Sequence, residues 1–219
     1  MKPYYEHSGV TIYHGDCRDV IPHITADVLV TDPPYGVNLG NSEETRPGLL
    51  VKKGYESYVD SPENFDRVVT PAITLALSIV DRGVVFCAGH MVWRLPPAQA
   101  IGGIFLPAAC GRGPWGWNSF AYALLYGKAP DLHKGAKPTG ISSSATADGR
   151  GHPCAKPLTW MGWAIQLSSR MGEIIVDPFM GSGTTLRAAK DLGRPAIGID
   201  IEERYCEIAV KRMAQETLF

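Results

Sequence analysis

The chain has 219 residues, of which 45% are hydrophobic and 20% are charged. This length provides enough apolar material for one continuous core but is short for two full domains, so we expect one domain over residues 1–219 with loop insertions. Lys and Arg total 21 against 22 Asp and Glu, which excludes the strong basic excess of a protein that coats nucleic acid.

The cysteines and the N-terminus indicate the compartment. Five cysteines, an odd number, lie scattered along the chain without a C-x-x-C pair, which favours neither a disulfide framework nor a metal site and fits a reducing cytoplasm. Residues 1–6 lack the apolar core of a signal peptide, and the most apolar stretch, 72–80, is far too short to span a bilayer. We therefore expect a soluble, cytoplasmic protein with no membrane partner.

Apolar runs that end in short polar or glycine turns alternate with helical segments along the chain. In chain order, the predicted elements are strands at 11–14 and 27–31, a helix at 64–80, strands at 83–87 and 120–126, a helix at 159–169, a strand at 173–176, a helix at 184–192, a strand at 195–199 and a helix at 203–214. The strands lack polar alternation, which indicates that both faces are covered. The predicted fold class is α/β, with a mostly parallel, doubly wound sheet and flanking helices.

Two stretches break this pattern and are expected to be functional loop insertions. Residues 36–60 are polar and rich in glycine, and residues 127–151 hold almost no large apolar side chain. Trp160 and Trp163, by contrast, stand at helical spacing within a predicted helix, so we expect them to pack in the core.

Acidic residues follow four of the predicted strands. Asp16, Asp32, Asp177 and Asp200 each stand at or just beyond a strand end, which is where open parallel sheets bind their ligands. A single acid in this position more often caps the next helix. Four of them together favour a binding site at the carboxyl edge of the sheet.

A glycine-rich turn, residues 177–185, joins a predicted strand to a predicted helix. Its glycines allow a ligand to approach the backbone, and the helix N-terminus offers free N–H donors. Thr184 stands where a nucleoside triphosphate loop needs lysine, and Leu186 stands where a dinucleotide fingerprint needs a third glycine. Asp200, at the end of the next strand, is suited to hold both hydroxyls of a ribose. The pattern predicts a nucleoside-containing cofactor without a pyrophosphate.

The turn Asp32-Pro33-Pro34-Tyr35 directly follows an apolar strand. Two consecutive prolines remove two backbone donors and leave rigidly placed carbonyl acceptors beside the carboxylate. Such a turn is suited to hold an amino group, and the tyrosine ring offers a face for a planar base. The alternative is a strand-ending turn with a tyrosine that only packs.

These two turns resemble those of S-adenosylmethionine-dependent DNA amino-methyltransferases, which modify N6 of adenine or N4 of cytosine. The turn at 32–35 precedes the turn at 177–183, which is the permuted motif order of the β-class enzymes. Residues 14–17, 152–157 and 198–201 are similar to further segments of the family, so that the resemblance extends over nearly the whole chain. It implies the Rossmann-like methyltransferase fold and S-adenosyl-L-methionine as the cofactor.

The resemblance also implies roles for individual residues. The catalytic turn would consist of Asp32, Pro33, Pro34 and Tyr35. The cofactor would be bound by residues from four segments, namely Asp16, Cys17, Asp32, Lys156, Pro157, Asp177, Pro178, Phe179, Gly181, Ser182, Gly183, Thr184, Thr185, Asp200 and Ile201. Within this set, Asp200 would hold the ribose, Asp16 and Cys17 the adenine edge, and Lys156 the methionine end. Core packing stays an alternative for Cys17 and Phe179, and a surface position for Lys156.

DNA is the expected substrate, with the target base flipped out of the duplex. Lys128, Lys134, Lys137 and Arg150 give the second loop a local basic excess suited to phosphate contacts, although exposed lysines are ordinary in loops. The chain lacks a separate target-recognition domain, so a short site, relaxed recognition or a homodimer stays open. A cognate restriction endonuclease and a prokaryotic or phage context also stay open.

An aspartate at the head of the catalytic turn favours N6-adenine, because family members that act on cytosine more often begin this turn with serine. N4-cytosine methylation is the first alternative. Methylation of RNA or of a protein glutamine, which also presents a planar nitrogen, ranks lower. A nucleotide-binding module without catalysis would leave the turn at Asp32 without a use.

Overall fold

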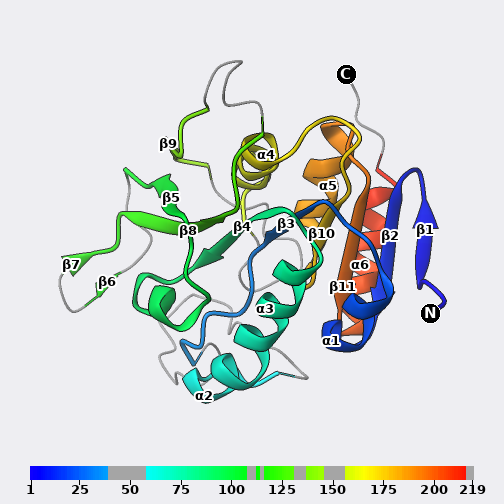
Figure 1. Ribbon diagram of the computed structural model, residues 1–219, viewed down its shortest axis with the longest axis horizontal. Helices are drawn as coiled ribbons and strands as arrows, with labels where there is room; N and C mark the ends of the chain where they lie inside the picture. The colour runs from blue at the N-terminus through cyan, green and yellow to red at the C-terminus, as the bar shows by residue number, and fades with distance from the viewer. Residues whose placement is uncertain (39–57, 108–111, 114–115, 131–136, 146–155, 216–219) are drawn as a thin grey trace, which may run out of the picture.

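Figure 1 shows the computed structural model, which describes residues 1–38, 58–107, 112–113, 116–130, 137–145 and 156–215. The strands in these ranges are β1 (Tyr5–His7), β2 (Val10–His14), β3 (Val28–Thr31), β4 (Arg82–Cys87), β5 (Ala100–Phe105), β6 (Arg112–Gly113), β7 (Gly116–Trp117), β8 (Phe120–Tyr126), β9 (Gly140–Ser142), β10 (Ile175–Asp177) and β11 (Ala196–Asp200). The α-helices are α1 (Cys17–Val20), α2 (Pro62–Asn64), α3 (Thr70–Ser78), α4 (Leu158–Ser168), α5 (Thr184–Asp191) and α6 (Glu203–Met213). In the same ranges, no helix has the length and apolar character needed to cross a membrane.

The main sheet has the strand order β1-β2-β11-β10-β3-β4-β8-β5-β9. The five strands β2, β11, β10, β3 and β4 run parallel to one another. Strand β1 is antiparallel to β2, and β8 is antiparallel to both β4 and β5. The predicted α/β fold with a mostly parallel sheet is confirmed. All six predicted strands are present, each with bounds close to those expected from the sequence.

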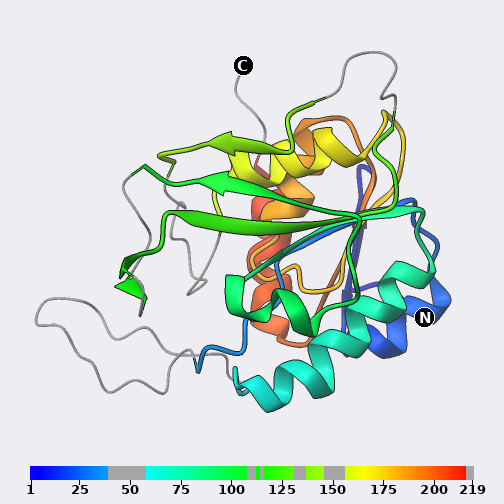
Figure 2. The same ribbon diagram turned by 60° about the vertical axis from the view of Figure 1, so that its left-hand side comes forward.

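Helices cover both faces of this sheet (Figure 2). Along β3, Val28 and Val30 belong to the core that contains α4, α5 and α6, whereas Leu29 belongs to the core beneath α1 and α3. This alternation explains why the strand is apolar at every position. The expected core role of Trp160 and Trp163 is confirmed, since the centroids of their rings lie 6.5 and 6.3 Å from that of Phe86.

The connections of β3 and β10 place a crevice at their carboxyl ends. The chain passes from β3 to its neighbour β4 through α3, and from β10 to β11 on the other side through α5. Strands β3 and β10 are adjacent, so their connections leave in opposite directions. Ligands in open α/β sheets bind at such a switch point. The topology therefore predicts the site between the turns after β3 and β10.

The helix predicted at 64–80 is divided into three parts in the structure. A π-helical segment, Phe65–Val69, separates α2 from α3, and the N–H of Thr70 bonds to the carbonyl of Phe65. Pro71 has no N–H to donate to the carbonyl four residues earlier, and its ring would crowd that carbonyl. The wider turn avoids this conflict.

Strand β5 was not expected from the sequence. Gly102 and Gly103 interrupt its apolar run, and glycine within a strand weakens a strand prediction. A Cβ atom on Gly102 would lie 2.0 Å from the carbonyl oxygen of Thr139, so the chain needs glycine where another backbone segment approaches. Strands β1, β6, β7 and β9, each two or three residues long, were also not predicted, because such short runs give no periodic signal.

Gly183 joins the glycine turn to α5 and packs against α6. Its φ is +77°, and a Cβ atom there would lie 2.8 Å from the Cβ of Ala209. Gly172 has a similar φ, +82°, with no atom within 4 Å of an added Cβ. We expect Gly172→Ala to lower the free energy of unfolding by about 1 kcal/mol, and Gly183→Ala by about 3 kcal/mol because the contact adds to the backbone strain.

Urea denaturation of the two variants measures the difference. Ala209→Gly removes the 2.8 Å contact with the Cβ of Ala209 but costs about 1 kcal/mol by itself within α6. The double variant should therefore lose less than the sum of the losses in Gly183→Ala and Ala209→Gly. Equal losses of unfolding free energy in Gly172→Ala and Gly183→Ala would show that contact with α6 does not add to the destabilisation.

Candidate active site

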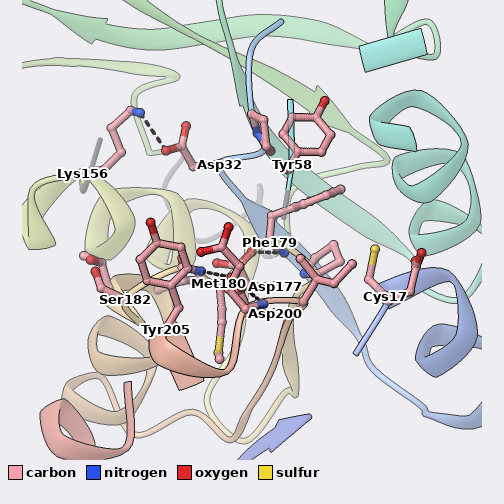
Figure 3. A pocket seen from close by; sticks show the side chains of 18 of the residues that line it. Cys17, Asp32, Tyr58, Lys156, Asp177, Phe179, Met180, Ser182, Asp200 and Tyr205 are labelled. Atoms are coloured by element: carbon pink, nitrogen blue, oxygen red, sulfur yellow. Dashed lines mark hydrogen bonds and ion pairs between the residues drawn. The ribbon is translucent and has the colours of Figure 1, made fainter. Parts of the chain in front are cut away.

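A cavity lies at the carboxyl ends of β3, β10 and β11, at the switch point predicted by the topology. It encloses about 910 Å³, part of which is open to solvent. Asp32, Asp177 and Asp200, which end these three strands or directly follow them, all line it, as does Asp16 from the turn after β2. In Figure 3 the Asp32–Lys156 pair and Cys17 lie on opposite sides of this cavity.

Asp177 links the turns after β3 and β10. Its Oδ1 accepts hydrogen bonds from the hydroxyl of Thr31 at 2.6 Å and from the N–H of Phe179 at 3.1 Å. Burial raises the pKa of this carboxyl to about 6, while bonds from Thr185 and Thr31 oppose the rise. Asp177 therefore holds the floor of the cavity together, because its bonds cross from one strand end to the next.

Asp200 fixes the glycine turn relative to α6. Its Oδ2 accepts the N–H of Gly181 and its Oδ1 accepts the N–H of Glu202, both at 2.9 Å. Burial raises the pKa of Asp200 to about 7, against the lowering effect of these two bonds. Each carboxylate oxygen has a second lone pair for a ligand hydroxyl, so the bonds orient the carboxylate without using its full capacity.

Asp32 forms a compact group with Tyr35 and Lys156. The hydroxyl of Tyr35 donates to Oδ1 of Asp32 at 2.5 Å, and the ammonium of Lys156 lies 2.7 Å from Oδ2. The same ammonium lies 4.8 Å from the centroid of the Tyr35 ring. The side chains of Asp32 and Lys156 are each only 16% exposed. Lys156, 124 residues from Asp32, is thus a partly buried partner of the turn at 32–35 and not a surface lysine.

Asp16 and Cys17 line the far side of the cavity. Asp16 caps α1 by accepting the N–H of Arg18 at 2.9 Å, and it also pairs with the guanidinium of Arg18. This hydrogen bond from the Arg18 side chain lowers the pKa of Asp16. Burial raises the pKa of the Cys17 thiol to about 12, so this side chain is neutral and contributes an apolar surface.

Most of the residues predicted to bind a cofactor lie in the cavity lining. Four predicted catalytic or cofactor-binding residues do not, namely Pro33, Tyr35, Pro157 and Gly183. Gly183 packs against α6 as described above, while Pro33 and Pro157 are buried outside the lining. Tyr35 contacts two residues of the lining, because its hydroxyl bonds to Asp32 and its ring lies beneath the ammonium of Lys156. The hydroxyl of Thr184 accepts a hydrogen bond from Arg212 at 3.0 Å. The remaining predicted residues in the lining are Pro34, Pro178, Phe179, Gly181, Ser182, Thr185 and Ile201.

The structure places two of the predicted DNA-binding residues away from this cavity. Strand β8 runs antiparallel to β4, with Tyr126 opposite Gly83, so Lys128 emerges at the amino end of β4. Lys137 donates to the carbonyl of Gln166, near the end of α4. Both lie at the edge of the sheet opposite the turn at 32–35, and their expected role in DNA binding stays a prediction. Lys134, Arg150 and most of the two predicted loop insertions lie outside the described residues.

Other residues line the cavity without having been predicted. Tyr205 is buried on α6, and Glu202 is buried just before it, where it pairs with Arg204 at 2.7 Å. Glu202 stands two residues after Asp200, a spacing that could have suggested it. The apolar additions, Tyr58, Val68 and Met161, belong to no motif and are identified only by the fold.

The model of the DNA methylase family matches residues 91–211 of this chain, which is more than half of its length. The chain belongs to the N6/N4 DNA methylase family. The family resemblance inferred from the two turns is therefore confirmed. The match covers the glycine turn and Lys156 but not the turn at 32–35.

The chain is also similar in sequence or structure to individual DNA methyltransferases. The chain is 27% identical to the type II methyltransferase M.ScaI of Streptomyces caespitosus, over 98% of this chain and 84% of the relative. The structure of an M1.HpyAVI–SAM complex matches with a TM-score of 0.67 and 22% identity, over 94% of this chain and 100% of that chain. PvuII DNA methyltransferase, described as cytosine-N4-specific, matches with a TM-score of 0.71 and 16% identity, over 100% of this chain and 91% of that chain. The two structures support the fold of this DNA methylase.

Proposed function

We propose that this DNA methylase transfers a methyl group from S-adenosyl-L-methionine to the exocyclic N6 amino group of adenine in DNA. The observation that carries the proposal is that Asp32, an acceptor suited to an amino group, shares one cavity with Asp200, an acceptor suited to a ribose. A donor and an acceptor of the methyl group can therefore meet in one enclosed space.

The charges of the lining support this cofactor. Lys156 is the one lysine or arginine among the described residues that line the cavity, whereas five residues carry carboxyl groups, namely Asp16, Asp32, Asp177, Asp200 and Glu202. S-Adenosyl-L-methionine bears a sulfonium and an ammonium group against a single carboxylate. An acidic cavity with one cation matches that distribution of charge.

The proposed orientation follows the length of the cavity. Asp200 would accept the ribose hydroxyls, and Asp16 with the neutral surface of Cys17 would border the adenine. Lys156 would then meet the methionine carboxylate on the opposite side. Gly181 and Ser182 contribute backbone at the centre, where the absence of a side chain at Gly181 leaves space for the ligand.

When bound, the cofactor supplies an electrophilic methyl group, and the residues of the catalytic turn prepare the nucleophile. An exocyclic amine is a poor nucleophile because its lone pair is delocalised into the ring. Asp32 and the Pro33 carbonyl would each accept one of its N–H groups, which orients the lone pair toward the methyl group. Asp32 would also be the first acceptor of the proton that the nitrogen loses after transfer.

The target atom is inaccessible inside a stacked duplex, so the base must leave the helix. Tyr35 adjoins Asp32 in the catalytic turn and would provide the stacking surface for the flipped base. Such stacking contributes about 1–3 kcal/mol per base. Adenine is preferred to cytosine because aspartate heads the turn. Cytosine is the alternative, because its N4 amino group presents the same pair of N–H donors.

Analysis of the methylated product tests the proposal. The purified protein is incubated with isotopically labelled S-adenosyl-L-methionine and unmethylated DNA, which is then digested to nucleosides for mass spectrometry. We expect labelled N6-methyladenine. Labelled N4-methylcytosine would show that the target base is cytosine and would leave the mechanism unchanged. Label found only in RNA or protein offered in parallel would overturn DNA as the substrate.

A further inference from the structure

Lys156 occupies the position that the proposed target base requires. Its ammonium lies 2.7 Å from Asp32 and 4.8 Å from the centre of the Tyr35 ring. A base that stacks on Tyr35 and donates its amine to Asp32 would lie in the corner between the same two groups. The ammonium and the target base therefore compete for one place.

The pair is enclosed, so Lys156 does not leave it without another partner. Both side chains are 16% exposed, and separating a partly buried ion pair leaves two charges poorly solvated. The incoming amine replaces the ammonium at Asp32 by donating its N–H groups. Lys156 in turn needs another anion that it can reach from the cavity wall. The other carboxyl groups of the lining already have hydrogen-bond or ion-pair partners, namely those of Asp16, Asp177, Asp200 and Glu202.

The cofactor would bring such an anion to the cavity. Lys156 is followed by Pro157, which directly precedes α4. The side chain of Lys156 lies on the side of the cavity opposite Cys17 (Figure 3). If the adenine lies beside Cys17, the methionine carboxylate lies toward Lys156. This step rests on the proposed function, because it uses S-adenosyl-L-methionine as the ligand.

We propose that Lys156 couples cofactor binding to acceptance of the target base. Without cofactor, Lys156 holds Asp32 and covers Tyr35, so that the site rejects the base. With cofactor bound, Lys156 pairs with the methionine carboxylate and leaves Asp32 and Tyr35 available. Lys156 is thus a positioning residue, and by thermodynamic reciprocity the target base also strengthens cofactor binding.

The test compares ligands that differ only in the carboxylate. The target sequence is first mapped by locating methylated bases in DNA treated with the wild type. Binding of a duplex with that sequence is then measured by fluorescence anisotropy without ligand, with S-adenosylhomocysteine, and with decarboxylated S-adenosylhomocysteine. Neither ligand supports methyl transfer, so affinity is measured without turnover.

We expect S-adenosylhomocysteine to tighten duplex binding by the wild type on the order of ten-fold, and the decarboxylated ligand to have no such effect. Lys156→Met should bind the duplex without ligand more tightly than the wild type and lose the response to the carboxylate. Lys156→Arg, which keeps the charge, should retain the response. Lys211→Met, a change at an exposed lysine near the end of α6 and outside the cavity lining, is the matched control and should also retain it.

Two results would overturn the proposal. One is an equal response of the wild type to both ligands, which needs no variant and so does not depend on folding of a substituted protein. The other is an unchanged response in Lys156→Met. The proposed function is tested separately at the mapping step, where a lack of methylated DNA would contradict it before any binding is compared.

Discussion

Asp32→Ala should lower the single-turnover rate of methyl transfer by about 10³-fold, because it removes both the acceptor that orients the target amine and the first acceptor of its proton. Cofactor affinity should change by no more than a few-fold. Asp32 lies at the edge of the cavity that faces Tyr35, and its loss leaves Lys156 available to the cofactor carboxylate. The rate is measured with saturating DNA, and cofactor affinity by calorimetry.

Asp32→Asn is the matched variant for this measurement. It keeps an acceptor oxygen of the same shape but has no negative charge to receive the proton or to hold Lys156, so its rate should lie between those of Asp32→Ala and the wild type. Methyl transfer by Asp32→Ala within ten-fold of the wild type would remove Asp32 from the catalytic role. A parallel loss of cofactor binding would instead assign Asp32 mainly to the cofactor.

The order and type of the central elements could be predicted from the sequence, because burial on both faces produces apolar runs that are easily recognised. Strand β3 is one such case, with Val28 and Val30 on one face and Leu29 on the other. The edge of the sheet beyond β4 was harder to predict. In β5, glycine is required by the approach of Thr139, a contact between distant segments that local propensity does not record.

The candidate site was predicted as far as its residues belong to turns after strands. Asp177 and Asp200 follow strands that the sequence indicates clearly, and the fold brings them to one cavity. The partner of Asp32 was not foreseen as such, because Lys156 is 124 residues away and only the packing of α4 against the sheet brings the two together. The positions of Lys128 and Lys137 in the fold could not be predicted for a related reason, because the charge of a loop does not indicate the edge of the sheet from which the loop emerges.

Asp200→Ala should weaken cofactor binding by about 100-fold or more, since two hydrogen bonds from ribose hydroxyls to a carboxylate would be lost. It should also destabilise the protein, because the N–H groups of Gly181 and Glu202 lose their acceptor. Calorimetric titration with S-adenosylhomocysteine and urea denaturation measure the two effects. Glu203→Ala, an exposed acid three residues farther along the chain, is the control that should preserve affinity.

The stability of the protein should depend on pH through the ionisation of Asp200. Burial raises its pKa to about 7 from 3.8, so between these values the folded protein binds a proton that the unfolded chain does not. The free energy of unfolding should therefore fall as pH rises through this window and level off above about pH 7. Asp177, with a pKa of about 6, contributes with the same sign over the lower part of the window.

Cofactor affinity should change in the opposite direction. Ribose hydroxyls donate to the ionised carboxylate, and a cationic ligand favours that form further, so binding should tighten as pH rises from about 6 to 8. Binding near pH 6.5 should release a proton, which appears in calorimetry as a dependence of the observed heat on the ionisation enthalpy of the buffer. Asp200→Asn does not titrate and should lose this part of the dependence. If its affinity followed pH as the wild type does, the titrating group would lie elsewhere in the cavity.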